Sequence, residues 1–325
     1  MMVSNGLPPS TEPLRTGRRL RGLTEGNGMR RGLSMAAGLF LWMFVFADGT
    51  SAQRQIQLYA TIVDSSGAPA SSVAPEDVRV TENDVEAKVL KVEPVEWTTK
   101  VQILLDTGGG VGSANLNQLR NGVRGLIEAL PPGLEMTLVT TAPQPRIVVR
   151  ATTDRQALLA GIDKISPDSG AGRFVESLNE ALQRFERDTT DFFGIVVSLG
   201  TTMGDNRVPD RDVNQIFERA QKKPTTVHVV MLSAGSQSAS GGVIQQEVGM
   251  QVAKMTNGRY EGINVASRIA TLLPEIGAQI AKSNQGASKQ FRITAERPGN
   301  SNEPSKISMS ARNGKVVTSV TVGSH

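Results

Sequence analysis

The stretch that decides the fold is Lys100–Gly112, which reads KVQILLDTGGGVG. An apolar run of this length bounded by glycine is typical of a fully buried strand, and the glycine tract marks a sharp turn of the backbone. From Asn115 onward, apolar residues recur at three- and four-residue steps, which predicts an amphipathic helix. Asp106 is therefore expected where a parallel strand ends and its crossover helix begins, at the sheet edge where open α/β folds place their ligand sites.

The same alternation of apolar strands and striped helices continues through the chain. Strands are predicted at 136–141, 146–150 (antiparallel to the one before), 194–199, 227–232 and 259–263. Helices are predicted at 158–165, 174–185, 213–220, 245–255 and 269–280. This order predicts an α/β fold over residues 98–285, a doubly wound and mostly parallel sheet of Rossmann-like type, covered by helices on both faces.

Two flanking segments show the period-two pattern of β structure. Residues 53–97 and 286–325 each contain three short alternating runs separated by turn residues. Three strands from about forty residues bury too little surface to be stable alone. We therefore expect the two segments to pack together as one small all-β module, a β-sandwich, with the α/β domain inserted between its halves.

The charge of the chain is concentrated at its N-terminus. Residues 1–31 hold six Arg and two Glu, which leaves 29 basic and 29 acidic residues in the remainder. The pI near 9.5 therefore comes from this short stretch. A neutral remainder has no basis for binding nucleic acid through phosphate contacts, and no nucleic-acid partner is expected.

The residues after this basic stretch have the layout of a secretory signal peptide. Arg30-Arg31 precedes a nearly apolar run over 33–46, and small residues ending at Ala52 form a cleavage site. We assign 29–52 to the signal peptide. Cleavage after Ala52 predicts an extracytoplasmic protein, either periplasmic or secreted.

The start of the chain leaves two further points open. Residues 1–28 are rich in Gly, Pro and Arg, and we interpret them as a non-native or disordered extension, with Met29 instead of Met1 as the translation start. The alternative to cleavage is a membrane anchor formed by 33–46, although this run is short for the roughly 30 Å of a bilayer core. No other contact with a membrane is expected.

The chain contains no Cys, which excludes disulfides, thiolate metal sites and a Cys nucleophile. Only two His are present, at 228 and 325, so a zinc site or a Ser-His-Asp triad is also hard to build. His228 lies inside the apolar run TTVHVVML. This setting favours a buried core histidine.

Four motifs in order resemble a von Willebrand factor type A domain: the strand VQILLD with its glycine-rich turn, the loop SGAGRFVESL, the strand IVVSLG and the later AKMTNGRYEGI. The run LYATIVDSSGAPASSVAPEDVRVTENDVEAKV ahead of them is similar to the leading module of exported bacterial proteins related to this family. The resemblance spans residues 55–296. It implies adhesion or assembly through a divalent ion at the carboxyl edge of the sheet, held by an Asp-x-Ser-x-Ser turn, a Thr from a second loop and an Asp from a third.

The residues at these positions depart from the family's pattern. The turn keeps Asp106, but Gly108 and Gly110 stand at the two Ser positions. Gly172 stands at the Thr position and Gly200 at the third-loop Asp position, so four of the five positions lack a side-chain oxygen. A hard cation wants about six oxygen ligands. The resemblance therefore implies a degenerate metal-ion-dependent adhesion site, for which we expect no bound metal and no cofactor.

Two other arrangements at this edge stay open. In the first, the guanidinium of Arg173 reaches Asp106 and replaces the cation as a charge-assisted partner, against the simpler interpretation of a solvated Arg. In the second, Thr201 or Thr202 and Asp205 join Asp106 in a residual metal site.

An enzymatic interpretation starts from two D-[ST]-G triplets, which begin at Asp106 and Asp168. Paired carboxylates that share a proton are the machinery of aspartic proteases. Such enzymes are nearly all β, whereas the first triplet here opens a helix and the second follows no apolar strand. The tract GGGVGS also lacks the Lys-Ser/Thr ending of a phosphate-binding loop.

The sequence as a whole therefore favours a binding protein without enzymatic activity. The expected partner is a protein or a component of the cell envelope or extracellular matrix. The loops at 108–113, 169–173 and 200–206 are expected to contact it.

Overall fold

The computed structural model describes residues 55–204, 210–233, 241–287, 290–298 and 306–322. The segments interpreted above as an N-terminal extension and a signal peptide, as well as Asp205, lie outside these residues. The strands that the structure describes form two sheets of six strands each. None of the described helices combines the length and the apolar character that crossing a bilayer requires.

One sheet is mostly parallel and has the strand order β6-β5-β4-β7-β8-β9. Its strands are β4 (Thr98–Leu105), β5 (Glu135–Thr140), β6 (Arg146–Thr152), β7 (Phe192–Thr201), β8 (Thr225–Leu232) and β9 (Tyr260–Ile263). Neighbouring strands run parallel except β6, which pairs antiparallel with β5 at the edge. The fold class expected from the sequence is confirmed, including the antiparallel strand after β5.

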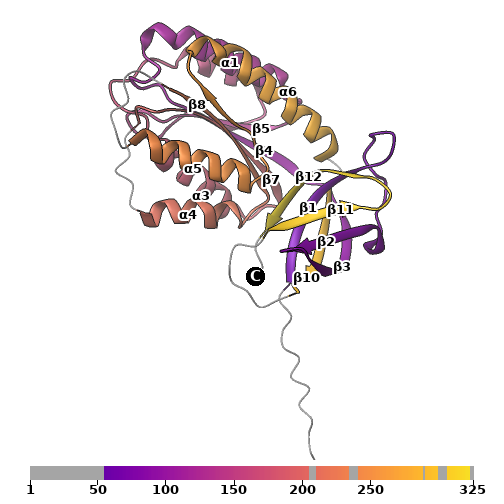
Figure 1. Cartoon of the computed structure of the whole chain (residues 1–325). Helices are drawn as coiled ribbons and strands as arrows, with labels where there is room; N and C mark the ends of the chain where they lie inside the picture. Colours follow the sequence, from indigo (N-terminus) through magenta and orange to yellow (C-terminus); the bar gives the residue numbers. More distant parts are fainter. Residues whose placement is uncertain (1–54, 205–209, 234–240, 288–289, 299–305, 323–325) are drawn as a thin grey trace, which may run out of the picture. The chain divides into compact units, whose positions relative to one another are not determined.

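Helices cover both faces of this sheet (Figure 1). One face carries α1 (Leu116–Ala129), α2 (Arg155–Asp163) and α6 (Ile269–Ala287), and the other carries α3 (Phe174–Arg187), α4 (Asp210–Ala220) and α5 (Gly241–Met255). Successive residues of β7 show the division: Ile195 and Val197 belong to the first core, and Val196 between them belongs to the second. Burial on both faces explains why the strands read as unbroken apolar runs.

The helices pack closely enough to need glycine at their contacts. A Cβ atom on Gly122 of α1 would lie 2.6 Å from the carbonyl oxygen of Ile269 in α6. The half-buried guanidinium of Arg155 donates to the carbonyls of Ile127, Leu130 and Pro131 at the end of α1. These carbonyls have no partner within the helix, so Arg155 supplies the missing donors.

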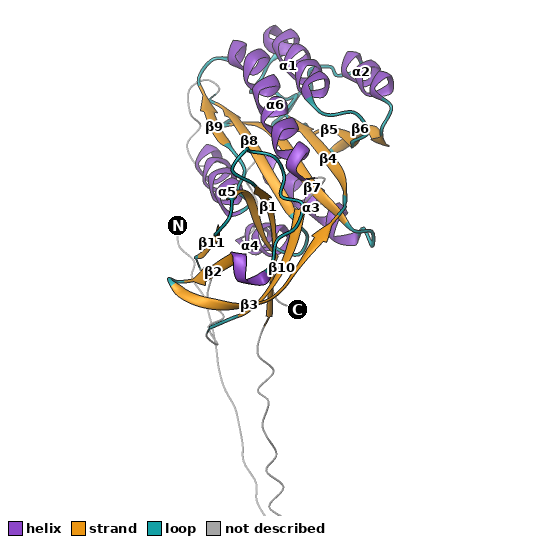
Figure 2. Ribbon diagram, turned by 90° about the vertical axis from the view of Figure 1, so that its right-hand side faces the viewer, coloured by secondary structure: helices purple, strands orange, loops and turns teal. Residues whose placement is uncertain are grey.

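The second sheet is antiparallel and joins the two flanking segments of the chain (Figure 2). Its order is β11-β2-β3-β10-β1-β12. The strands are β1 (Gln55–Val63), β2 (Val78–Glu82), β3 (Val85–Val95), β10 (Gln290–Glu296), β11 (Ile307–Ala311) and β12 (Lys315–Val322). Each C-terminal strand thus pairs with at least one N-terminal strand.

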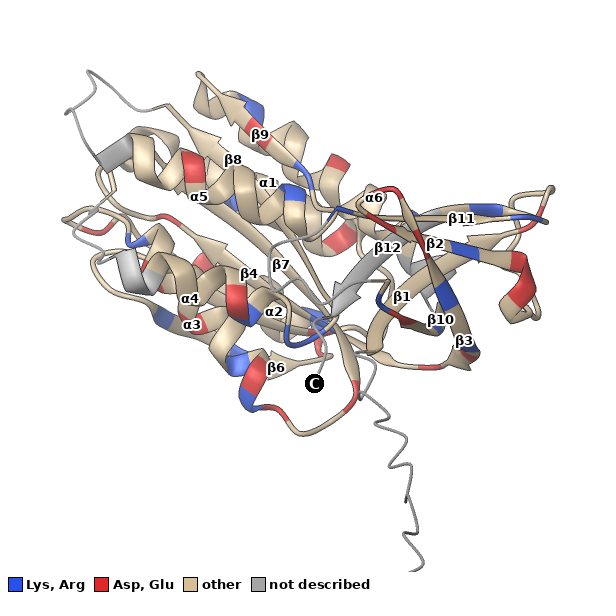
Figure 3. Cartoon of the chain, turned by 60° about the horizontal axis from the view of Figure 1, so that its bottom comes forward, with Lys and Arg blue, Asp and Glu red and all other residues tan. Residues whose placement is uncertain are grey.

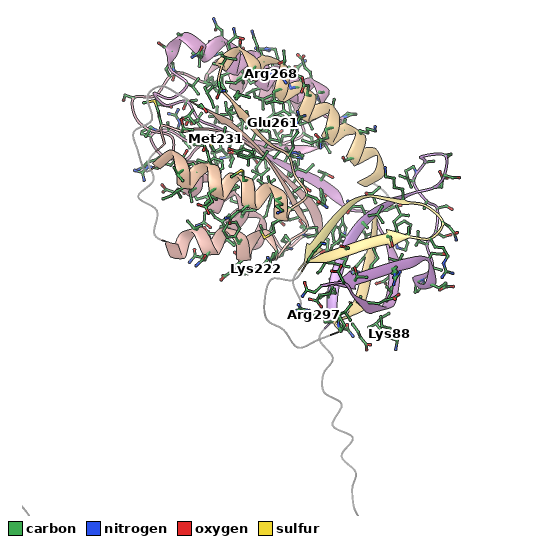
Figure 4. The ribbon with its side chains drawn as sticks, in the orientation of Figure 1. Lys88, Lys222, Met231, Glu261, Arg268 and Arg297 are labelled. Atoms are coloured by element: carbon green, nitrogen blue, oxygen red, sulfur yellow. The ribbon has the colours of Figure 1, made fainter. Side chains whose placement is uncertain are left out.

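The arrangement of this module differs in one respect from the sandwich expected above. The strands follow one continuous order because the long β3 pairs with β2 through 85–87 and with β10 through 88–95. The outermost strands, β11 and β12, contact each other, so the sheet curls around a core of its own. Arg297, labelled in Figure 4, follows β10 and donates to the buried carboxylate of Glu82 in β2.

Candidate functional site

Three chain segments meet at the carboxyl edge of the parallel sheet. Asp106 follows β4 directly, and its amide donates to the carbonyl of Leu199 in β7 at 2.9 Å. The loop at 164–173, between α2 and α3, reaches the same edge, where the amide of Arg173 donates to the carbonyl of Thr141 at 3.0 Å. The position expected for Asp106, at the carboxyl end of a parallel strand, is confirmed.

The carboxylate of Asp106 lies inside this cluster. Only 1% of the residue is exposed. One carboxylate oxygen, Oδ1, accepts from the amide of Gly108 at 2.8 Å, and Oδ2 accepts from the hydroxyl of Thr201 at 2.7 Å. Burial raises the pKa of Asp106, and these two donors partly oppose the shift. No Lys, Arg or His within the described part of the chain is among the groups that act on this pKa.

At three of the expected ion-binding positions, neighbouring atoms occupy the space that a side chain on the glycine would need. A Cβ atom on Gly172 would lie 2.2 Å from Oδ2 and 2.3 Å from Cγ of Asp106. A Cβ atom on Gly110 would lie 2.2 Å from Oγ1 of Thr201, and one on Gly108 would lie 2.4 Å from the carbonyl oxygen of Gly170. The space that side chains would need at these positions is therefore occupied, and the edge is closed over Asp106.

Gly200, expected at this face, points elsewhere. A Cβ atom there would meet Phe174 at 2.8 Å and Met231 at 3.2 Å, in the apolar core on the side of α3 and α5. Figure 4 labels Met231, which belongs to the neighbouring strand β8. Because side chains alternate along a strand, the next residue, Thr201, faces Asp106. Thr201, the last residue of β7, thus contacts the carboxylate in place of the third-loop Asp that the family resemblance implies.

Arg173 lies beside the cluster, and its guanidinium makes other contacts. Its Nε donates to the carbonyl of Pro143 at 2.8 Å, and Nη1 donates to Glu176 at 3.0 Å. Arg173 is not among the groups that shift the pKa of Asp106. Its contacts tie the second loop to the β5–β6 connection, which differs from the cation-replacing role considered from the sequence.

A second set of contacts joins the first and second loops. The hydroxyl of Thr107 donates to Oδ2 of Asp168 at 2.7 Å, and the amide of Asp168 donates back to the carbonyl of Thr107 at 2.8 Å. The amide of Gly109 donates to the carbonyl of Gly170 at 2.9 Å. This link was not predicted from the sequence. The signal that could have indicated it is the repeated D-[ST]-G triplet, because Thr107 of the first triplet bonds to Asp168 of the second.

The two triplets do not form a proton-sharing pair. Asp106 bonds to Gly108 and Thr201, whereas Asp168 bonds to Thr107 and lies 3.9 Å from Arg146. Asp168 is not among the groups that act on the pKa of Asp106. A dyad requires the two carboxylates to interact directly, so this geometry does not support the aspartic-protease alternative.

The described residues do not fit a divalent cation at this edge. Asp106 and Thr201 supply three side-chain oxygens: Oδ2 of Asp106 and Oγ1 of Thr201 bond to each other, and Oδ1 of Asp106 accepts from the amide of Gly108. The backbone at Gly172 packs so closely on the carboxylate that a Cβ atom there would lie 2.2 Å from Oδ2, which leaves no room for a further ligand side chain at this position. Within the described ranges, no three His, Cys, Asp or Glu side chains converge in a way that could hold a metal ion.

Uncharged residues are exposed along the outer surface of this edge, beside the charged Arg146, Asp168 and Arg173. We call its exposed residues the rim: Gly109, Ser113, Pro143, Gln144, Ser169, Gly170 and Met203. In the view of Figure 3, basic and acidic residues are interspersed along the elements of the chain. The rim therefore offers a ligand backbone groups, two serine hydroxyls and the longer side chains of Gln144 and Met203.

His228 is a buried residue of β8, as the sequence favoured. It is 4% exposed, and its Nδ1 accepts from the amide of Arg259 at 3.2 Å. Burial lowers the pKa of His228 to about 4, and the nearby charge of Arg259 adds to this effect. The imidazole is therefore neutral in the folded protein near pH 7.

The chain is similar to a known protein family and to several solved structures. Residues 101–199 match the family model of the von Willebrand factor type A domain, which confirms the resemblance over that stretch. A von Willebrand factor type A protein from Catenulispora acidiphila is 12% identical, with a TM-score of 0.48 over 85% of this chain and 74% of that one. A conserved hypothetical protein, BatB, from Bacteroides thetaiotaomicron is 13% identical, with a TM-score of 0.43 over 57% and 99% of the two chains.

An aerotolerance-related membrane protein from Bacteroides fragilis is also similar in structure. It is 14% identical, with a TM-score of 0.40 over 56% of this chain and 99% of that one. A search of the curated proteins finds no match.

Proposed function

We propose that this chain is an exported binding protein whose von Willebrand factor type A domain contacts its partner through the rim without a bound divalent cation. The domain type is typically a protein–protein interaction module. The partner class is a protein or a component of the cell envelope or extracellular matrix. We propose no enzymatic activity.

The observation that carries the metal-independent mode is the contact between Gly172 and Asp106. A side chain at 172 would overlap the carboxylate, with a Cβ–Oδ2 distance of 2.2 Å. The carboxylate therefore turns inward, toward Gly108 and Thr201, and not outward toward a ligand. A partner that approaches this edge meets backbone groups and small or uncharged side chains but, among the described rim residues, no aromatic one, which suits close approach of two main chains more than aromatic anchors.

Export is supported by the sequence alone. The basic pair Arg30-Arg31, the apolar run over 33–46 and the small residues up to Ala52 follow the order of a cleavable signal. The absence of Cys means that the domain reaches its fold in an oxidising compartment without disulfide bonds.

Chelation is expected to leave partner capture unchanged. The purified chain, immobilised and exposed to envelope extract, should retain the same bound proteins to within about twofold with EDTA or with millimolar Mg²⁺, because affinity comes from the rim. Ser169→Trp should lower capture about tenfold by blocking the rim. Ser71→Trp, at an exposed site in the β1–β2 connection, is the matched control and should leave capture unchanged.

Isothermal titration with Mg²⁺ and Mn²⁺ tests the same idea without a partner. We expect no binding heat at millimolar metal. Saturable metal binding, or capture that EDTA abolishes and Mg²⁺ restores, would contradict the proposal. Either result would favour the alternative that Asp106 and Thr201 act as metal ligands together with Asp205. Oγ1 of Thr201 and Oδ2 of Asp106 lie 2.7 Å apart.

A further inference from the structure

We infer that Asp106 is a positioning residue: it holds the three loops of the rim in one arrangement by accepting hydrogen bonds inside the cluster. This inference rests on the proposed function, because the rim is the surface that it positions. It assigns a role to the one side chain that remains at the ion-binding positions implied by the family resemblance. That role requires an acceptor at Asp106 but not a negative charge directed at a cation.

The two oxygens of Asp106 connect different loops. Oδ1 binds the amide of Gly108 and so fixes the turn that follows β4. Oδ2 binds the hydroxyl of Thr201, the last residue of β7. Thr201 is fully buried, so its hydroxyl cannot exchange Asp106 for solvent without opening the cluster.

The second loop is held by packing against the same group. A Cβ atom on Gly172 would overlap the carboxylate, at 2.2 Å from Oδ2, so the backbone at this position packs against Asp106. On either side of this contact, the Gly109 amide bonds to Gly170 at 2.9 Å and the Asp168 amide bonds to Thr107 at 2.8 Å. These two bonds form only while the first and second loops stay together, so their amides report on the state of the rim.

The charged groups around the cluster leave the carboxylate without a cationic partner of its own among the described residues. Arg173 bonds to Pro143 and Glu176, and Arg146 lies 3.9 Å from Asp168. A neutral acceptor of the same shape can therefore replace Asp106. A ligand for a metal ion cannot be replaced in this way, since Asn lacks the charge and one of the two acceptor oxygens.

Hydrogen exchange at the amides of Gly109 and Asp168 distinguishes a hydrogen-bond acceptor from a metal ligand at position 106. It is measured in Asp106→Asn and in Asp106→Ala. In Asp106→Asn, exchange at Gly109 and Asp168 should stay within about threefold of the parent chain, because the amide oxygen accepts from Gly108 and its NH₂ can donate to Thr201. In Asp106→Ala, exchange at both amides should become at least tenfold faster, because both donors lose their acceptor. The amides of β4 should be unchanged in both variants.

A second pair of variants removes a hydroxyl without touching Asp106. Thr201→Val deletes the donor to Oδ2 and should speed exchange at Gly109 at least threefold. Thr140→Val is the matched control: Thr140 is also buried, at the end of β5, but its hydroxyl has no hydrogen-bond partner. Its removal should leave rim exchange unchanged.

If Asp106→Asn accelerated amide exchange as much as Asp106→Ala does, the inference would be wrong. It would also be wrong if 10 mM MgCl₂ slowed amide exchange in the parent chain but not in Asp106→Asn. The proposed function is judged separately, by the effect of Ser169→Trp on capture. A rim that Asp106 holds together but that captures nothing would refute the proposed function and leave the positioning role in place.

Discussion

Gly172→Thr is expected to destabilise the protein by about 3 kcal/mol or more and to create no metal site. This substitution restores the residue that the family resemblance implies at this position. Its Cβ would lie 2.2, 2.3 and 2.5 Å from three atoms of the Asp106 carboxylate, so either the second loop or Asp106 must move. Urea unfolding measures the loss, and titration with Mg²⁺ measures any gain in metal affinity.

A double-mutant cycle ties this cost to Asp106. Gly172→Ala should also be strongly destabilising, because the overlap begins at Cβ. Asp106→Ala removes the atoms that the new methyl group would strike. The combined variant should therefore be more stable than the sum of the two single effects by at least about 1 kcal/mol.

Gly109→Ala is the matched control for this cycle. Gly109 lies in the same turn, and a Cβ atom there would meet only the carbonyl oxygen of Gly170, at an ordinary 3.8 Å. We expect a change of less than about 1 kcal/mol in the free energy of unfolding. If Gly172→Ala were as well tolerated as Gly109→Ala, the edge would not be closed over Asp106.

Most of the fold could be predicted because burial imposes a clear period on the sequence. β10 and β12 lie within the segment 286–325, where β structure was predicted, since each alternates apolar and polar residues between turn signals. α4 and α5 begin earlier than predicted, at Asp210 and Gly241. α4 opens with the charged run Asp210-Arg211-Asp212 and α5 with Gly241-Gly242, and neither stretch carries an apolar period from which a helix could be predicted.

The contacts of the site could be predicted less well than its place. The position of Asp106 follows from strand polarity, which the alternation of strands and helices determines. Which residue at the end of β7 faces Asp106 depends on the register, and a shift of one residue turns a side chain to the other face. Gly200 and Thr201 are neighbours in sequence, yet one faces the core and the other faces the carboxylate.

The partner of Arg173 could not be predicted for a different reason. A long side chain on a loop reaches several acceptors, and the choice depends on where other loops place their carbonyls. The carbonyl of Pro143, which accepts from Arg173, comes from the β5–β6 connection, thirty residues earlier in the chain. Pattern and spacing hold no information about such a contact, whereas the three-dimensional path of the chain defines it.

Acidification from pH 7.5 to 5 is expected to cost about 2 kcal/mol of stability through His228 alone. Its pKa is about 4 in the folded protein and near 6.5 in the unfolded chain. Between these values the unfolded chain binds the proton and the folded protein does not, so stability falls as the pH falls. His228→Gln should remove this contribution, and urea unfolding at both pH values measures it.

The pH dependence of the parent chain alone does not isolate His228, because Asp106 changes the free energy of unfolding in the opposite direction. The comparison with His228→Gln is therefore needed. Burial raises the pKa of Asp106, so the folded protein binds a proton on this carboxyl more readily than the unfolded chain does. Acidification therefore favours the folded state through Asp106 while it disfavours the folded state through His228. If the parent chain and His228→Gln lost the same stability between pH 7.5 and 5, His228 would not be the buried neutral imidazole that its contact with Arg259 describes.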